Sequence, residues 1–159
     1  MKIEFGYKYR DLITGFDGIV ETRGMFFTGC DRVKLVSGLK DEDKQWFDVP
    51  SLEFVDEGIY DKLQSEACNR YDDIENAKFS FGDKVKDSVS GFEGVIIGIA
   101  ISISGDINYG VCPKYDKNSK SNDAVWYDEG RLELIKEKEK EVKNDSKRTG
   151  GATCNLKIR

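Results

Sequence analysis

The sequence predicts a mainly β protein made of two copies of one small five-stranded module, with a helical connector between them and a charged tail. Three observations predict this: an internal repeat at a constant offset, short apolar runs separated by glycine turns, and a charge balance that changes outside the repeat. The predicted segments are a first module in residues 1–56, an acidic helical connector in 57–76, a second module in 77–137 and a basic C-terminal tail in 138–159.

The repeat aligns glycines, aromatic residues and turn acids in the same order. At an offset of 76 residues, the matching segments are 5–11 (FGYKYRD) with 81–87 (FGDKVKD), and 14–20 (TGFDGIV) with 90–96 (SGFEGVI). After a four-residue insertion the offset becomes 80, and residues 46–48 (WFD) match residues 126–128 (WYD). Chance rarely produces such an ordered match, so we interpret the chain as an internal duplication.

Each copy divides into five short runs that are apolar or alternate between apolar and polar residues. In the first copy we expect strands at residues 5–11, 18–27, 31–37, 45–48 and 52–55. Gly15 and Gly18 mark the first turn, because glycine adopts positive φ without steric cost. Five strands in so short a module predict a small SH3-like barrel.

The motifs resemble those of small proteins from phage and prophage genomes that carry such a barrel singly or in tandem. The resemblance rests on the order G-x-x-V-x-D, [ST]-G-F-x-G, a glycine hairpin, W-[FY]-D and L-E, and it covers both modules. The modules are more distantly similar to KOW and Tudor-type SH3-like barrels. The resemblance implies this fold and a phage context. By analogy, it also implies an accessory protein that blocks a host defence factor.

The composition favours a binding protein over an enzyme. With 38% hydrophobic and 35% charged residues the chain is a globular protein, and it contains no histidine to act as a general base near neutral pH. Its four cysteines, Cys30, Cys68, Cys112 and Cys154, form no C-x-x-C pair, so we expect neither a metal site nor a cofactor.

Charge and hydropathy restrict the partners. Residues 1–55 and residues 77–137 each carry 8 basic and 10 acidic groups, whereas residues 56–76 carry 2 and 7, and residues 138–159 carry 7 and 3. Nearly balanced modules are poor candidates for binding a phosphate backbone, so we do not expect nucleic acid. No apolar run approaches the roughly 18 residues of a membrane span, and the N-terminus lacks a signal-peptide core, so we expect a cytoplasmic protein of the host cell.

The two copies differ most in the long second strand. Alternation along this strand places four isoleucines of the second copy on one face, opposite Ile96. If Ile96 points inward, they form an outward apolar row and an interface for a homo-oligomer. Alternatively, the strand bends and some of them belong to the core. The row consists of Ile97, Ile99, Ile101 and Ile103.

The first copy is then the candidate ligand-binding module. Its candidate residues combine aromatic rings with guanidinium groups, which suit stacking and bidentate hydrogen bonds. They are Arg23, Arg32, Arg10, Tyr7 and Phe26. Trp46 recurs as Trp126, so we expect both to be packing residues.

Two pairs of recurring aspartates lie next to turns, Asp11 with Asp87 and Asp48 with Asp128. We expect them to accept hydrogen bonds from free backbone N–H groups of these turns, without a catalytic role.

Three functions follow from these expectations. The first is a non-enzymatic phage accessory protein that binds and inhibits a host protein. The second is a sponge that sequesters a small nucleotide signal in pockets between subunits. The third is a virion or replication accessory component.

Overall fold

The computed structural model of the chain describes residues 3–59, 77–118 and 122–138. Within these ranges it contains ten strands and three 3₁₀ helices of three residues each, so the prediction of a mainly β protein is confirmed. None of the described helices has the length and apolar character needed to cross a membrane. Residues 60–76 of the predicted connector and residues 139–159 of the predicted tail lie outside the described residues.

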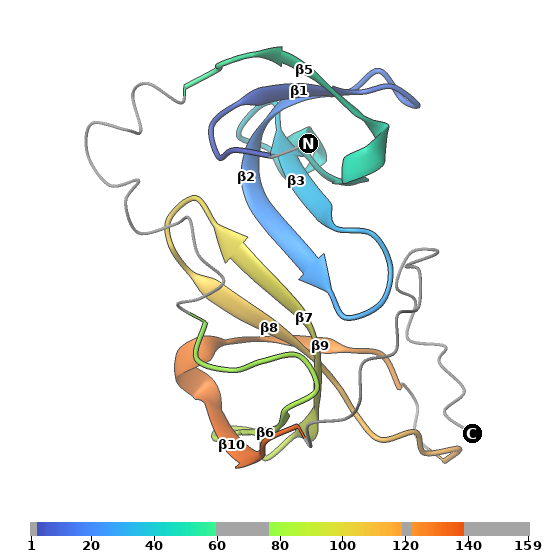
Figure 1. Cartoon of the computed structure of the whole chain (residues 1–159), viewed down its shortest axis with the longest axis vertical. Helices are drawn as coiled ribbons and strands as arrows, with labels where there is room; N and C mark the ends of the chain where they lie inside the picture. Colours follow the sequence, from blue (N-terminus) through green and yellow to red (C-terminus); the bar gives the residue numbers. More distant parts are fainter. Residues whose placement is uncertain (1–2, 60–76, 119–121, 139–159) are drawn as a thin grey trace. The chain divides into compact units, whose positions relative to one another are not determined.

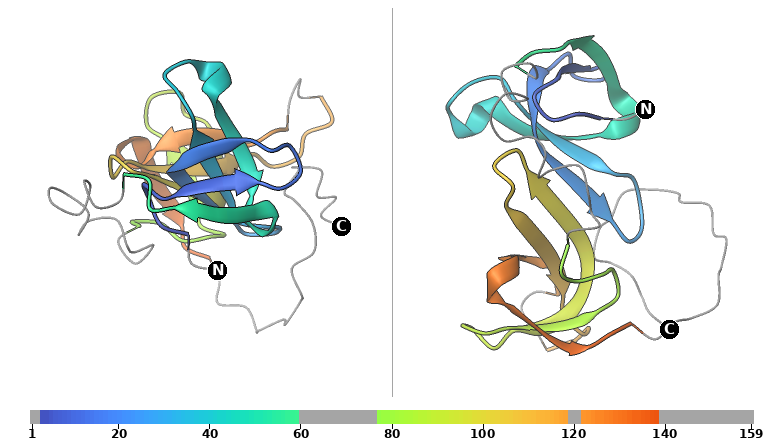
Figure 2. Two further views of the ribbon diagram at one scale, coloured as in Figure 1. Left: turned by 90° about the horizontal axis from the view of Figure 1, so that it is seen from above. Right: turned by 60° about the vertical axis from the view of Figure 1, so that its left-hand side comes forward.

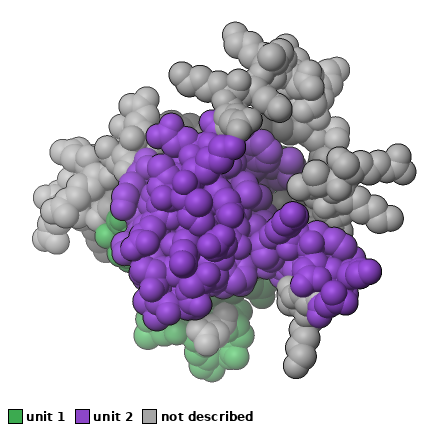
Figure 3. All heavy atoms as spheres, turned by 90° about the horizontal axis from the view of Figure 1, so that it is seen from below, with its two compact units in different colours: residues 1–25, 31–76, 101–106 green, residues 26–30, 77–100, 107–159 purple. Residues whose placement is uncertain are grey.

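The chain divides into two compact units (Figure 3). Unit 1 comprises residues 1–25, 31–76 and 101–106, and unit 2 comprises residues 26–30, 77–100 and 107–159. Each unit therefore contains one copy of the repeat together with the tip of the long hairpin of the other copy.

Unit 1 contains a sheet of five antiparallel strands with the order β5-β1-β2-β3-β4 (Figure 1). β4 pairs only with β3 among the described strands, so the sheet is open by its hydrogen bonding. Short 3₁₀ helices lie before β4 and between β4 and β5. The strands are β1 (Lys8–Asp11), β2 (Asp17–Phe26), β3 (Arg32–Val36), β4 (Lys44–Asp48) and β5 (Leu52–Asp56), and the helices are η1 (Asp41–Asp43) and η2 (Val49–Ser51).

Unit 2 repeats this arrangement with the order β10-β6-β7-β8-β9 (Figures 1 and 2). A 3₁₀ helix, η5 (Glu129–Arg131), again joins the fourth and fifth strands. The two copies therefore share both the strand order and this connection. The strands are β6 (Lys84–Asp87), β7 (Glu93–Ser102), β8 (Ile107–Cys112), β9 (Val125–Asp128) and β10 (Leu132–Lys136).

The first strand is shorter than predicted. We expected it to begin at residue 5, but β1 begins at Lys8 because the chain turns at Gly6, whose φ is 81°. The equivalent Gly82 has a φ of 90°, so the second copy turns in the same way before β6. The other four strands of the first copy begin and end within one residue of the predicted bounds.

The core follows from the alternation of side chains along the strands. In β3, Val33 and Leu35 are fully buried while their neighbours are half-buried, as expected for a strand with one inward face. Phe16 packs against Phe47 in unit 1, with ring centroids 5.2 Å apart. The equivalent rings of Phe92 and Tyr127 lie 5.7 Å apart in unit 2.

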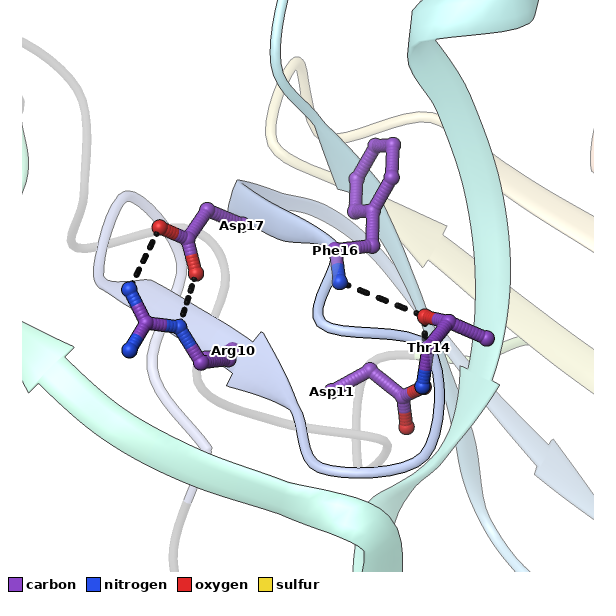
Figure 4. A network of polar contacts seen from close by, with 5 residues as sticks. All are labelled: Arg10, Asp11, Thr14, Phe16 and Asp17. Atoms are coloured by element: carbon purple, nitrogen blue, oxygen red, sulfur yellow. Dashed lines mark hydrogen bonds and ion pairs between the residues drawn. The ribbon is translucent and has the colours of Figure 1, made fainter.

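A buried aspartate fixes the turn between β1 and β2. The Asp11 side chain is 2% exposed and accepts hydrogen bonds from the backbone N–H (2.8 Å) and hydroxyl (2.7 Å) of Thr14. Its other oxygen accepts a hydrogen bond of 2.6 Å from the hydroxyl of Ser51 in η2. Figure 4 shows the part of this network that lies within the turn. The carboxylate therefore joins the end of β1 and the first turn to η2, which lies 40 residues further along the chain.

The second copy uses the same aspartate with a different partner. Asp87 is fully buried, and it accepts hydrogen bonds from the backbone N–H and hydroxyl of Ser90, as Asp11 does from Thr14. The place of Ser51 is taken by Arg131, which donates Nε and a terminal nitrogen to the two oxygens at 2.9 and 2.7 Å. The expectation that these two aspartates bind turn N–H groups is confirmed.

The other recurring pair does not behave as predicted. Asp48 and Asp128 precede the 3₁₀ helices η2 and η5, but neither side chain forms a capping hydrogen bond. Asp48 instead forms an ion pair with Arg32, its cross-strand partner in β3, at 2.9 Å. The prediction was wrong because strand register, which brings Arg32 opposite Asp48, competes with the local turn for the carboxylate.

We predict that replacing Arg131 tests the network around Asp87. Arg131→Ala removes a partner of a buried carboxylate, so the thermal midpoint should fall by on the order of 10 °C. Arg131→Ser should lower the thermal midpoint by about half as much, because the hydroxyl of Ser51 at the equivalent position donates a hydrogen bond to Asp11. Circular dichroism melts near neutral pH measure both midpoints, and equal losses would contradict the proposed equivalence of the two networks.

The same network predicts a loss of stability in acid. Hydrogen bonds from Arg131 hold the pKa of Asp87 well below its usual value of 3.8, and the hydroxyl of Ser51 lowers the pKa of Asp11. A lowered pKa stabilises the folded state above the unfolded pKa, and this contribution disappears as the pH falls through the folded pKa. The thermal midpoint should therefore decrease as the pH is lowered from about 5 to about 2. For Asp87→Asn, the thermal midpoint should depend less on pH and should approach that of the wild type in acid.

Candidate functional site

The five predicted ligand-binding residues have different surroundings in the structure. Arg10 is exposed, and its guanidinium binds both oxygens of Asp17 across the mouth of the first turn, at 2.6 and 2.9 Å (Figure 4). Arg32 pairs with Asp48, as described above. Phe26 belongs to unit 2. Arg23 and Tyr7 both act electrostatically on the phenol of Tyr9.

A β-bulge places Arg23 on the inner face of the sheet. Strict alternation would place Glu21, Arg23 and Met25 on the face opposite Val20, but the register between β2 and β3 shifts between Val20 and Thr22. After this shift Arg23 pairs with Val33, whose side chain is 1% exposed. Cross-strand partners lie on the same face, so Arg23 points toward the core. Glu21 instead forms ion pairs with Lys34 on β3 and Lys44 on β4.

The predicted isoleucine row is partly buried. Ile99, which is equivalent to Arg23, is 1% exposed, and Ile101 is 6% exposed, although strict alternation would place them opposite the buried Ile96. Ile97 and Ile103 are half-buried. The burial of Ile99 agrees with the alternative in which the strand bends and some of its isoleucines join the core. Their role in an interface stays a prediction.

We call the residues around the Arg23 guanidinium the Arg23 cluster. The guanidinium lies over the ring of Phe5 at 5.7 Å from its centroid, and Phe5 is buried. Tyr9 is buried, the Arg23 charge acts on its phenol, and its ring contacts Phe54 edge-on at 5.8 Å. The ring of Phe54 is 47% exposed and also lies 5.5 Å from the ring of Tyr7. The cluster comprises Glu4, Phe5, Tyr7, Tyr9, Arg23 and Phe54.

Burial and nearby charges determine the electrostatics of the Arg23 cluster. Burial raises the pKa of the Tyr9 phenol, and a hydrogen bond from the backbone N–H of Glu4 partly opposes this. The Glu4 carboxylate and the Tyr7 phenol raise the pKa further, whereas the Arg23 charge lowers it. One cation and one carboxylate therefore face the same phenol, and the cluster has little net charge.

Arg23 differs from the other arginines of the described residues. Arg10, Arg32 and Arg131 each form an ion pair with an aspartate. Arg23 is half-buried and, among the described residues, has a ring as its contact and no carboxylate in an ion pair. Removing a cation from water without an anionic partner costs free energy, so an anion bound to this guanidinium would be stabilising.

The second copy closes the equivalent region with apolar or fully hydrogen-bonded residues. Ile99 replaces Arg23 and Val85 replaces Tyr9, and both are buried. Asp83 replaces Tyr7 and accepts hydrogen bonds from the backbone N–H groups of Ser80 (2.8 Å) and Lys138 (2.9 Å). The Arg23 cluster is therefore specific to the first copy.

Another buried polar group of the second copy is also satisfied within unit 2. The Tyr109 hydroxyl donates to Glu129 at 2.6 Å and accepts from the backbone N–H of Phe79 at 3.2 Å. Glu129 also accepts from the backbone N–H of Lys78 at 3.0 Å. Burial is the main cause that raises the pKa of Tyr109, so the phenol stays protonated as a donor. This network stabilises the unit.

The two tryptophans occupy equivalent positions with different surroundings. Trp126 lies against Gly98 and Gly110, where an added Cβ would come within 2.8 and 3.2 Å of the indole. Phe26, which belongs to the same unit, contacts this indole edge-on at 6.1 Å. Trp46 is instead the cross-strand partner of Lys34. Both indoles remain about 40% exposed (39% and 42%), so they are only partly the packing residues that we expected.

Sequence reasoning missed Phe54 as a member of the Arg23 cluster. A signal was present, because Phe54 aligns with Leu134 at the offset of 80 and is aromatic only in the first copy. Within the ranges that the structure describes, no group of three histidine, cysteine, aspartate or glutamate side chains could hold a metal ion. Comparisons with protein-family models, with curated proteins and with solved structures find no match to this chain.

We predict that Gly98→Ala displaces the Trp126 indole, because the new methyl group would overlap the ring. In a Trp46→Phe background, Trp126 is the only tryptophan that contributes to the fluorescence. Its emission maximum should shift to longer wavelength as the ring moves into water. The thermal midpoint should fall by roughly 5 °C. Gly130→Ala is the matched control, because an added Cβ there meets nothing within 4 Å. Unchanged emission of the Gly98→Ala protein would contradict the described packing.

Proposed function

We propose that the chain is a non-enzymatic binding protein made of two SH3-like barrels. Support comes from the strand order, because the first strand of each copy pairs with both the second and the fifth strand. This pairing brings the beginning and the end of each copy together, as closure of a five-stranded sheet into a small barrel requires. The buried aspartate of each copy supports the same closure, because it links the first turn to the segment before the fifth strand.

In this proposal the first copy binds the ligand and the second copy supports the assembly. The observation that carries it is Arg23, which is half-buried without an ion pair among the described residues, while the equivalent Ile99 is buried in the core. A structural role alone favours the apolar residue, because isoleucine at this position is compatible with the fold of the second copy. Retaining a costly cation in only one copy is typical of a binding residue.

The ligand that we propose is a host protein, and the chain acts as a phage or prophage accessory protein that inhibits it. The resemblance of the repeated motifs to small phage proteins supports the context. The exposed ring of Phe54, which contacts Tyr9, and the half-buried Arg23 support the class of ligand, since aromatic residues and arginine dominate the binding energy of protein interfaces. Homo-oligomers of the chain would present several such sites.

A second candidate is a sponge for a small nucleotide signal, held in pockets between subunits. The neighbouring rings of Tyr7 and Phe54 favour it, because a planar base stacks on such surfaces while arginine binds phosphate. Native mass spectrometry of protein purified from its host reports the number of subunits and any retained molecule. Nucleotide released on heat denaturation would support the sponge, and a retained host protein would support the inhibitor.

We predict that Arg23→Ile abolishes ligand binding without loss of stability. The substitution installs the residue of the second copy and removes an unpaired, half-buried cation, so the thermal midpoint should stay the same or rise. The partner retained by the wild type should be lost, with a decrease of at least about 50-fold in affinity. Arg10→Ile is the matched control, because it removes the same charge from an exposed ion pair outside the Arg23 cluster. Equal binding by both variants would exclude Arg23 from the binding surface.

A further inference from the structure

β4 is an open edge of the sheet in unit 1, because it pairs only with β3 among the described strands. At one end of this ladder the N–H of Val49 donates to the carbonyl of Asp31 at 3.0 Å. At the other end the N–H of Ser37 donates to the carbonyl of Asp43 at 2.9 Å. Hydrogen-bonded and non-hydrogen-bonded pairs alternate in an antiparallel ladder, so every second residue of β4 directs its N–H and C=O groups away from β3. These residues are Lys44, Trp46 and Asp48.

The side chains of the same three residues share the outer face of the sheet. Side chains alternate along a strand, and Phe47, between two of the three, is buried in the core. Trp46 is 39% exposed, and the side chains of Lys44 and Asp48 are 34% and 50% exposed. The edge therefore presents a cation, an indole and a carboxylate in a row, next to backbone groups that a further strand could bind.

The order of these residues makes the edge complementary to itself. If two molecules pair their β4 strands antiparallel about a two-fold axis at Trp46, Lys44 of each molecule lies opposite Asp48 of the other. The two Trp46 side chains then lie opposite each other between these charged pairs. Opposite charges and aromatic rings stabilise a sheet when they lie directly opposite in neighbouring strands. The symmetric arrangement gives two ion pairs and one aromatic pair on one face.

The contacts within unit 1 are compatible with this pairing. Asp48 forms its ion pair with Arg32 at 2.9 Å, and Lys44 lies 3.8 Å from Glu21. A carboxylate accepts several hydrogen bonds and an ammonium group donates three, so each can bind a second partner. The backbone carbonyl of Asp48 accepts from the hydroxyl of Ser51 at 2.9 Å, and a carbonyl oxygen can accept a second hydrogen bond.

The second copy of the repeat lacks this complementarity. β9 is also an edge, because it pairs only with β8 among the described strands. In the equivalent pairing about Trp126, Ala124 takes the place of Lys44, so Asp128 would have no cation opposite it. The indole of Trp126 is also packed on glycines of its own unit. Self-complementarity is therefore a property of the first copy.

We propose that two molecules of the chain associate by antiparallel pairing of their β4 strands about a two-fold axis at Trp46. The proposal goes beyond the proposed function, because none of the paired residues belongs to the Arg23 cluster, and it adds an interface on the first copy. Five residues from each molecule form a small interface. The association is therefore weak and becomes measurable at concentrations of about 0.1 to 1 mM.

Charge reversal tests this pairing by analytical ultracentrifugation of the full chain, with a reductant present because the chain has four cysteines. Lys44→Glu and Asp48→Lys should each weaken self-association by at least about tenfold, because each places like charges opposite one another twice. An equimolar mixture of the two variants should associate as the wild type does, because each reversed charge then meets an opposite charge. Lys40→Glu is the matched control, because it makes the same change at a residue outside β4 whose side chain is 76% exposed.

Amide hydrogen exchange of the wild type tests the register without any substitution. Raising the concentration from about 20 μM to about 1 mM should slow exchange at Lys44, Trp46 and Asp48, whose N–H groups face the second molecule. The N–H groups of Gln45 and Phe47 are directed toward β3, so these two amides are the internal control.

Exchange rates at the three amides that do not change with concentration would overturn the proposal, and this measurement decides alone if a variant fails to fold. Self-association of Lys44→Glu equal to that of the wild type would also overturn it and would assign the contact to another surface. Folded variants that remain monomeric when mixed would exclude the two-fold register.

Discussion

The rest of each unit depends on a buried carboxylate at the end of its first strand. Asp11 and Asp87 lie in register with Leu52 and Leu132, the first residues of the fifth strands, and they bind both the first turn and the 3₁₀ helix that precedes the fifth strand. A buried carboxylate requires several donors, so the turn and the helix must meet in one arrangement. Ser51 donates to this carboxylate in the first copy and Arg131 does so in the second. The aspartate is therefore the same in both copies, whereas the residue that donates to it differs.

With the framework held in this way, the two copies diverge where the constraint is weak. The long second strand of the first copy carries Arg23 over a ring, whereas the second copy carries Ile99 in the core. Arg23 and Ile99 are both compatible with the same backbone conformation. An arginine can pack its aliphatic part as isoleucine does and extend its charged group toward the surface. Duplication thus separates two demands, since one copy can retain a costly group for binding while the other contributes stability.

Much of the fold was accessible from the sequence, and less of the site. Glycines at equivalent turns, the positions of the strands and the role of Asp11 and Asp87 followed from local patterns, because they depend on neighbours within a few residues. The partner of Asp48, the parity of β2 and the burial of Ile99 did not follow. Each depends on which residue lies opposite in another strand, and a bulge of one residue changes that relation for all later positions. The ion pairs of Arg10 with Asp17 and of Arg32 with Asp48 have the same origin, because each joins cross-strand partners.

The sequence by itself determined that the chain is a mainly β protein with an internal repeat, because turn residues and side-chain alternation act over short distances. Only the tertiary structure decided which arginines form ion pairs. Arginines at positions 10, 32 and 131 look equivalent to Arg23 in the sequence, yet folding brings an aspartate to each of them and a phenylalanine ring to Arg23. The reason is physical: a charge pair forms between groups that strand register and turns bring together, and this proximity is set by the whole sheet.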